Sequence, residues 1–270
     1  MSNNQKNNEA LRIAVAIKQV PPGLGGTTDA EKGYVLRTSP GRLNPFDAPA
    51  LELALRLKDK YRVKVDLFSM GPLQAEKTLK EAMSLGPDRA FHLCDPAFSG
   101  SDSLATSRTL IRAMDLEGPY DLIICGLATT DGGTGQVGPG LAALLQCPFV
   151  GRISEVISLE TPFLKVKQLY SDELLETQVT LPVVVSVIRE GFTLRLPSVK
   201  ARLKPRLITK LTLADLIGDD TQEAAYFGEK GSPTKILKTK KPDQPQKILA
   251  RPRPASAASV IIEAARKAKL

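Results

Sequence analysis

Residues 121–140 read DLIICGLATTDGGTGQVGPG. The first six form a nearly continuous apolar run, which is typical of a strand buried on both faces of a parallel sheet. A glycine-rich run, Asp131 to Gly140, follows and predicts a loop that leads into a helix beginning near Gln136. A strand, a glycine-rich loop and a helix in this order present backbone N–H groups and a positive dipole end to an anion. The stretch therefore predicts an α/β fold with a phosphate-facing nucleotide loop.

Strands and helices alternate along the chain before this stretch. Short β-branched or apolar runs predict strands over residues 12–18, 63–70, 90–94 and 121–126. Apolar residues at helical spacing predict helices that begin near residues 44, 75 and 102. In the first of these helices we expect Asn44 as the N-cap and Pro45 as the first helical residue. The alternation favours an open, mostly parallel nucleotide-binding sheet with helices on both faces.

The pattern changes after residue 160. Two runs that flank Tyr170-Ser171-Asp172 predict an antiparallel hairpin over 163–169 and 173–180, and residues 181–188 (LPVVVSVI) predict the last central strand. Beyond Leu196 the periodicity supports helices only over 213–217 and 256–268. We expect a disordered N-terminus over 1–10, an α/β nucleotide-binding domain over 11–198, and an extended C-terminal arm over 199–270 that wraps a partner subunit.

The positive charge is concentrated in the arm. The chain carries a formal net charge of +8, and from Val199 onward 16 Lys and Arg stand against 7 Asp and Glu. Such a segment indicates a solvated arm, an acidic protein partner or nucleic acid. Nucleic acid is disfavoured because residues 235–253 contain no aromatic side chain that could stack on bases.

Several classes of protein are disfavoured by composition. No apolar run approaches the roughly 20 residues that cross a bilayer, and the polar start lacks the features of a secretory signal, so we expect a cytoplasmic protein without membrane insertion. Cys94, Cys125 and Cys147 are far apart and lie in apolar surroundings, which predicts buried thiols without a metal site. Because His92 is the single histidine, hydrolase triads and multi-histidine metal centres are disfavoured, and no catalytic acid or base stands out.

The glycines allow more than one kind of nucleotide site. Gly133, Gly135 and Gly138 satisfy G-x-G-x-x-G, but the pattern follows the fourth predicted strand, whereas NAD-binding folds carry it in the first βα turn. Ligands of open parallel sheets bind outside the carboxyl ends of the strands, so the predicted crevice is bordered by residues 16–22, 44–47, 69–72 and 127–135. Two functions that such a crevice allows are an NAD-dependent dehydrogenase using the Gly133–Gly138 loop and an adenylate-sensing binding module.

Five motifs together resemble the electron-transfer flavoprotein beta subunit family. They are AIKQVP at 16–21, LNPFD at 43–47, SMGP at 69–72, AEKTLKEAMSLGPDRA at 75–90 and DGGTGQVGP at 131–139. The resemblance runs from about Arg12 to the final helix. It implies a heterodimer with a larger alpha subunit that holds an FAD, while the beta subunit binds a second nucleotide. That nucleotide is FAD in the electron-bifurcating branch, where NADH is oxidised, and AMP in other relatives.

The resemblance also assigns residues to this nucleotide. Carried over by position, they are Ala16, Asn44, Pro45, Phe46, Asp47, Met70, Thr129, Thr130, Asp131, Gly132, Gly133, Thr134, Gly135, Gln136, Val137 and Gly138. QVGP at 136–139 and GSPT at 231–234 resemble the bifurcating branch. Asp131 is an anion, so we expect it to accept from a ribose hydroxyl or to fix the loop through neighbouring N–H groups. Redox chemistry in such a protein belongs to the flavin, and the chain has to bind and orient it.

The resemblance also implies a second set of residues, which contact the redox partner. The family position that contacts the redox partner, such as an acyl-CoA dehydrogenase or a quinone or iron–sulfur oxidoreductase, corresponds to Ile188, Arg189, Phe192, Leu194 and Arg195. We expect this loop to expose its Phe and Leu beside the two arginines. The sequence departs from the family pattern in three places. Leu127-Ala128 replaces a cation and an amide, Gly132-Gly133 replaces acidic residues, and the docking loop is about three residues shorter.

Overall fold

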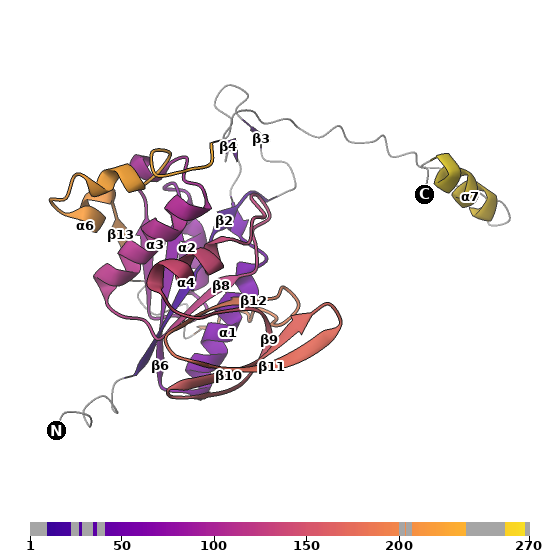
Figure 1. Cartoon of the computed structure of the whole chain (residues 1–270), viewed down its shortest axis with the longest axis horizontal. Helices are drawn as coiled ribbons and strands as arrows, with labels where there is room; N and C mark the ends of the chain where they lie inside the picture. Colours follow the sequence, from indigo (N-terminus) through magenta and orange to yellow (C-terminus); the bar gives the residue numbers. More distant parts are fainter. Residues whose placement is uncertain are drawn as a thin grey trace. The chain divides into compact units, whose positions relative to one another are not determined.

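A nine-stranded sheet is the framework of the computed structural model, which describes residues 10–22, 27–28, 35–36, 41–199, 203, 207–235 and 257–267. Its strands, in chain order, are β1 (Leu11–Ala16), β6 (Val63–Met70), β7 (Arg89–Leu93), β8 (Leu122–Gly126), β9 (Phe149–Glu160), β10 (Phe163–Tyr170), β11 (Glu173–Thr180), β12 (Val183–Val187) and β13 (Ile208–Leu211). They lie in the order β11-β10-β9-β12-β8-β1-β6-β7-β13 (Figure 1). Across the sheet, every neighbouring pair from β9 through β12, β8, β1, β6 and β7 to β13 is parallel, whereas β10 pairs antiparallel with both β9 and β11. This confirms the predicted sheet and hairpin.

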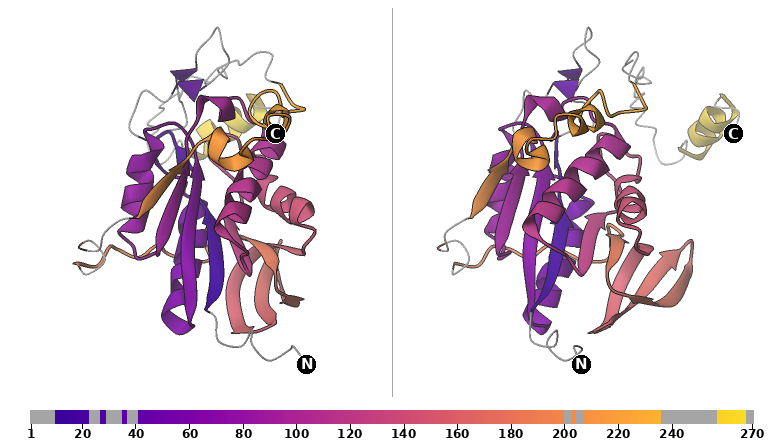
Figure 2. Two further views of the ribbon diagram at one scale, coloured as in Figure 1. Left: turned by 90° about the vertical axis from the view of Figure 1, so that its left-hand side faces the viewer. Right: turned by 60° about the vertical axis from the view of Figure 1, so that its left-hand side comes forward.

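Helices cover both faces of this sheet (Figure 2). One face packs against α1 (Asp47–Lys60) and α2 (Ala75–Met83). The other packs against α3 (Ser103–Glu117), α4 (Val137–Leu145) and α6 (Leu213–Ile217). Because successive residues of a strand point to opposite faces, Ile13 and Val15 of β1 join the first apolar cluster, while Ala14 and Ala16 join the second. The predicted layers are therefore confirmed.

Short elements complete the described chain. They are β2 (Gln19–Val20) paired with β5 (Arg42–Leu43), β3 (Thr27–Thr28) paired with β4 (Val35–Leu36), and the 3₁₀ turns η2 (Pro96–Phe98) and η3 (Glu223–Tyr226). Residues 238–270 form a second unit, in which α7 (Ala257–Lys267) is the described element. Within the described ranges, no helix combines the length and the apolar composition needed to cross a bilayer.

Two strands of the nine-stranded sheet were missed by the sequence patterns. β9 is 12 residues long, and its position between β10 and β12 joins the hairpin to the parallel sheet. β13 extends the sheet beyond β7, and Leu211, Leu216 and Phe227 pack into the second cluster. The sequence places the start of the arm at 199, whereas the first compact unit continues to Leu237. Residues 207–235 therefore pack on the chain's own core, although the sequence patterns assigned them to the arm.

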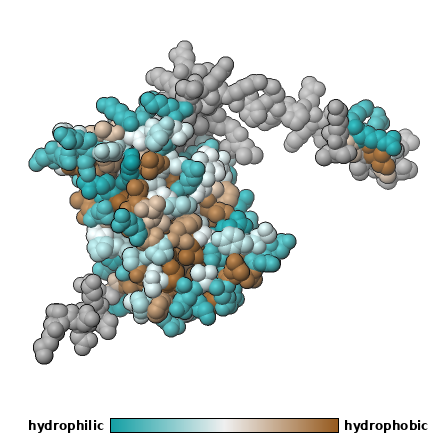
Figure 3. Space-filling view, viewed as in Figure 1, coloured by the Kyte–Doolittle hydropathy of each residue, from teal (hydrophilic) through white to brown (hydrophobic). Residues whose placement is uncertain are grey.

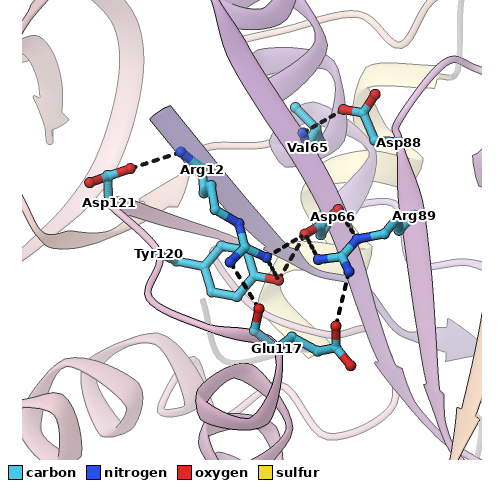
Figure 4. Close-up of polar contacts among 8 residues, drawn as sticks. All are labelled: Arg12, Val65, Asp66, Asp88, Arg89, Glu117, Tyr120 and Asp121. Carbon is cyan, nitrogen blue, oxygen red and sulfur yellow. Dashed lines mark hydrogen bonds and ion pairs between the residues drawn. The ribbon is translucent and has the colours of Figure 1, made fainter. Parts of the chain in front are cut away.

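A charged network closes the amino end of the sheet (Figure 4). Asp66 of β6 is 2% exposed and accepts hydrogen bonds from Arg89 Nη2 (2.7 Å), Tyr120 OH (2.8 Å) and Arg12 Nη2 (3.1 Å). Burial alone would raise the pKa of Asp66, but these donors outweigh it and lower the pKa. Glu117 of α3 accepts from Arg89 Nη1 at 3.0 Å, so the network ties three strands to the end of a helix.

The β9–β11 part of the sheet exposes apolar side chains. Residues coloured brown are visible in this part of the surface in Figure 3. Tyr170, Leu174 and Leu175, around the turn of the hairpin, are 45%, 60% and 47% exposed. Phe149 and Phe163, at the starts of β9 and β10, are also exposed, and charged pairs such as Lys167 with Glu155 lie between the strands.

Candidate functional site

The carboxyl ends of three neighbouring strands meet where the sequence placed the crevice. β1, β6 and β8 are adjacent and parallel, and they end at Ala16, Met70 and Gly126. The chain leaving β1 stays close to β6, because Ile17 N donates to Phe68 O at 2.9 Å. The loops that follow the three strands therefore lie at one edge, which is the position at which open α/β sheets bind ligands.

Asn44 links two of these loops to the start of α1. Its side chain is fully buried, and Nδ2 donates to Ala128 O at 2.8 Å and to Asp47 Oδ1 at 2.9 Å. Its backbone N–H donates to Lys18 O at 2.9 Å. Oδ1 of Asn44 has no hydrogen-bond partner among the described residues. Since buried acceptors are almost always paired, this oxygen is a polar group that the described residues leave unsatisfied.

The predicted start of α1 is wrong by two residues. The helix begins at Asp47 with Phe46 at the N-cap position, and Pro45 lies in a turn before it. Asn44 does not cap the helix with its side chain, because Oδ1 accepts no hydrogen bond from the first N–H groups of α1, and Asp47 N donates instead to the backbone O of Asn44 at 2.9 Å. The predicted residues Asn44 and Asp47 are nevertheless brought to the same edge as the glycine-rich loop.

Asp47 is a buried carboxyl beside this edge. It accepts from Lys18 N at 2.7 Å and from Asn44 Nδ2. Burial raises the pKa of Asp47 to about 7, because these two donors only partly offset the loss of hydration. A side chain at Gly126 would collide with Asp47 Oδ1 and Phe46 O, so glycine at the end of β8 is what lets the start of α1 approach.

The glycine-rich loop is folded by its own polar side chains. Thr129 Oγ1 accepts from Gly132 N (3.2 Å) and Gly133 N (3.3 Å), and Asp131 Oδ1 accepts from Gly132 N (2.9 Å). Gly133 and Gly135 have φ of +66° and +63°, a conformation that favours glycine. Asp131 therefore fixes the loop through a neighbouring N–H group, which is one of its two expected roles.

Helix α4 starts at the end of this loop, as predicted. Gln136 is the N-cap residue and Val137 the first helical residue. The first N–H groups of a helix have no intrahelical acceptor, and Pro139 contributes none, so the N–H groups of Val137 and Gly138 lie at the positive end of the helix dipole. Residues 130–136 are exposed. This is an arrangement that can bind an anion with backbone donors.

Lys18 is the charged residue that sequence reasoning missed. Its Nζ lies 2.8 Å from Asp131 Oδ2 and 2.9 Å from Asp131 Oδ1, so it brings a cation to the glycine-rich loop. The sequence lacks a cation after Gly126, and Lys18 supplies one from the end of β1 instead. The signal was present in the AIKQVP motif, but the pairing joins residues 113 positions apart.

The docking loop differs from its expected exposure. Phe192 is 9% exposed and packs into the first apolar cluster under Arg56, and Leu194 also packs against this cluster. The expectation of exposure is therefore wrong for Phe192, because Arg56 of α1 lies over its ring, whereas Leu194 is half-buried. Arg195 Nε donates to buried Glu52 at 2.9 Å. Burial would raise the pKa of Glu52, but bonds from Arg195 and Arg56 outweigh it and lower the pKa.

The remaining residues of the docking set divide between core and surface. Ile188 is buried, and Arg189 is exposed with its guanidinium 5.9 Å from the ring of Phe46. Arg189 thus places a surface cation next to the predicted nucleotide edge.

A cavity of about 200 Å³ lies elsewhere in the fold. Residues from the ends of α3 and α4 and the starts of β8 and β12 line it, among them Met114, Leu145, Cys147 and Val183. Among the described residues, none of those assigned to the nucleotide lines this cavity. A mostly apolar cavity of this kind does not offer the donors that a phosphate needs, so the chemistry favours the carboxyl edge.

Comparison with known proteins identifies the family of the chain. The Electron transfer flavoprotein domain matches residues 33–215. The chain is 37% identical to the electron transfer flavoprotein subunit beta of Thermoanaerobacterium thermosaccharolyticum, over 86% of this chain and 89% of that protein. It is 36% identical to the corresponding subunit of Megasphaera elsdenii over 87% and 88%. It is also 36% identical to the caffeyl-CoA reductase-Etf complex subunit CarD of Acetobacterium woodii, over 67% and 69%. The chain therefore belongs to the electron-transfer flavoprotein beta subunit family.

Proposed function

We propose that this chain binds FAD at the carboxyl edge of its sheet, pairs with an electron-transfer flavoprotein alpha subunit, and relays electrons between a donor and a redox partner. The observation that carries the proposal is the convergence of Asn44, Asp47 and residues 129–138 at this edge. AMP is the alternative nucleotide. Bound FAD would supply the redox chemistry, and the chain's own residues bind and orient it.

The residues at this edge fit a dinucleotide. Asn44 Oδ1 is buried and lacks a partner among the described residues, which suits the exocyclic amino group of an adenine. The N–H groups at the start of α4 suit a pyrophosphate, because hydrogen bonds to charged groups contribute about 1.5–3 kcal/mol each. Lys18 adds a positive charge beside them. Polar acceptors and phosphate donors are thus both present at this edge.

The experiment that tests the nucleotide is direct. The chain is co-expressed with its alpha subunit, the heterodimer is purified, and the nucleotides released by acid are separated and counted. Two FAD and no AMP per heterodimer support FAD in the beta subunit and the bifurcating branch, whereas one FAD and one AMP support the alternative. A preparation that releases a single FAD and no other nucleotide contradicts the proposal.

The same preparation separates the other functional classes. An NAD-dependent dehydrogenase should bind NAD(H) as an isolated chain and turn over a substrate, and an adenylate-sensing module should bind AMP or ATP in a complex without flavin. The glycine pattern follows β8 and not β1, the first strand of the sheet, and this disfavours a first-turn NAD site.

Partner contacts are part of the proposal. The relative whose name places it in a caffeyl-CoA reductase complex supports a partner that acts on acyl-CoA compounds. Of the docking residues, Arg189 is the exposed cation closest to the site, and we assign it the contact with the redox partner. Since residues 207–235 pack on the chain's own core, we assign the contact with the alpha subunit to the second unit, Lys238–Leu270.

A further inference from the structure

Residues 228–234, called here the C-terminal turn, lie against the chain segment that precedes α3. Ser232 is 4% exposed, and its Oγ donates to Gly228 O at 2.7 Å and lies 3.2 Å from Gly100 O. The same Oγ accepts from Asp102 N at 2.8 Å. One buried hydroxyl therefore connects the turn to Asp102, the N-cap residue of α3.

Asp102 receives a second contact from the turn. Its Oδ2 accepts from Thr234 N at 3.0 Å, while Oδ1 caps α3 by accepting from Leu104 N (2.9 Å) and Ala105 N (3.0 Å). Burial would raise the pKa of Asp102, but these backbone donors outweigh it and lower the pKa. Asp102 thus remains an anion that holds both the turn and the first turn of the helix.

The start of α3 in turn contacts the glycine-rich loop. Ser103 Oγ lies 3.2 Å from Thr134 Oγ1, and the latter accepts from Gln136 N at 3.4 Å. The two helices are closely packed at this end, because a Cβ added to Gly140 of α4 would lie 2.7 Å from Ser107 Oγ of α3. Contacts therefore run without interruption from the C-terminal turn to the loop that precedes α4.

We infer that the C-terminal turn positions the nucleotide loop: Ser232 and Asp102 hold Ser103 where it fixes Thr134. The inference rests on the proposed nucleotide function of residues 129–138. A loop with glycines at positive φ loses much conformational entropy when it is ordered. A contact that orders the loop before binding reduces this cost and so strengthens nucleotide binding. Ser232, Asp102 and Ser103 act through Thr134 and do not themselves contact the nucleotide.

The test uses four variants of the heterodimer with its alpha subunit. Ser232→Ala removes the buried hydroxyl, Ser103→Ala and Thr134→Val remove the two hydroxyls of the next contact, and Ser232→Ala is also combined with Thr134→Val. Glu223→Gln is the matched control, because it breaks the 2.6 Å ion pair with Arg112 in the same segment but leaves this chain of contacts intact. Hydrogen exchange of the amides of residues 129–137 is measured without nucleotide, and dissociation constants are measured separately for AMP and FAD.

We expect Ser232→Ala and Ser103→Ala to accelerate exchange over 129–137 and to weaken nucleotide binding by about 10-fold, the equivalent of one lost hydrogen bond. Glu223→Gln should change neither. The double variant should bind no more weakly than the weaker single variant, because both changes break one series of contacts. Ser103→Ala leaves the buried turn intact and decides the outcome if Ser232→Ala does not fold.

Two results overturn the inference. One is wild-type exchange and affinity in both alanine variants, and the other is additive losses in the double variant, which would mean that Ser232 acts without Thr134. Failure of the proposed function looks different. A wild-type heterodimer that binds neither AMP nor FAD rejects the nucleotide site, while exchange over 129–137 still shows whether the C-terminal turn orders the loop.

Discussion

Replacing Asp66 by Asn should destabilise the fold more than any other isosteric change at the amino end of the sheet. The carboxylate is the shared acceptor of Arg12, Arg89 and Tyr120, and it is 2% exposed. An amide keeps the shape but removes the charge and turns an NH₂ group toward these donors. Removing one partner of a buried ion pair costs about 3–5 kcal/mol. Because the Arg12 and Arg89 side chains are 24% and 38% exposed and reach water, the lower end, about 3 kcal/mol, is expected.

The assay is urea unfolding of the isolated chain followed by circular dichroism, with the midpoint and slope compared between variants. Glu76→Gln is the matched control, since Glu76 pairs with Lys80 at the surface of α2 and such pairs contribute less than about 1 kcal/mol. If Asp66→Asn lowers the free energy of unfolding by no more than this control, the network does not stabilise the fold as described.

The pH dependence of the free energy of unfolding tests whether Asp66 is ionised in the folded state. The pKa of Asp66 is lowered in the folded state from its usual 3.8, so the unfolded chain binds the proton more readily. Its stabilising contribution is therefore present above the unfolded pKa and is lost as the pH falls through the folded pKa. The difference between wild type and Asp66→Asn should stay constant from neutral pH down to about pH 5 and shrink in stronger acid. A difference that grows on acidification would refute the assigned charge state.

Four other changes test the site. The pKa of Asp47 is raised to about 7, so the free energy of unfolding of the wild type should fall as the pH rises from about 4 toward 7. Asp47→Asn should therefore gain about 2 kcal/mol relative to the wild type between pH 5 and pH 7. An equal difference between variant and wild type at both pH values would contradict this. Gly135→Val places a branched residue at φ +63° with its Cβ 3.1 Å from Leu127 O, and we expect the heterodimer to lose the beta nucleotide but keep the alpha FAD in acid extracts. Arg189→Ala should slow electron delivery to the redox partner in stopped-flow measurements while nucleotide content stays unchanged, and an unaltered rate would reject the docking assignment. Deleting Lys238–Leu270 should weaken assembly with the alpha subunit, and a stable one-to-one heterodimer of the truncated chain at micromolar concentration would show that this unit is not needed.

Elements with a strong local pattern were predictable from sequence. The strand β6 and the helix α6 have the predicted bounds, and α4 begins within one residue of the predicted place. Their signals are short range: apolar spacing, a capping residue, and glycine or proline at the ends. The glycine-rich loop and its place at the carboxyl edge followed from the same reasoning together with the rules of parallel sheets. The alternation of strands and helices was also enough to determine the fold class.

Elements that depend on distant partners were not predictable. The strand β9 has glycine near its start and no clear alternation, and its conformation follows from pairing with β10 and β12 on either side. Asn44 looks like a helix cap in sequence, but its Oδ1 accepts no hydrogen bond from the helix, and its Nδ2 donates to Ala128 O, 84 positions away. Phe192 looks like an exposed docking residue until α1 covers it. In each case the decisive contact joins residues that are far apart in the sequence, so a local pattern cannot reveal it.

The site also combines features that are predictable from local sequence with features that depend on the fold. The sequence by itself indicated the family, through the resemblance of its motifs, and it predicted the glycine-rich loop, because glycine and helix starts carry local conformational signals. The tertiary structure alone decided that Lys18 supplies the cation at Asp131 and that Ser232 holds Asp102 from 130 positions away. Hydrogen bonds and ion pairs act over about 3 Å in space whatever the separation in sequence, so the partner of a polar side chain is known only when the chain has folded.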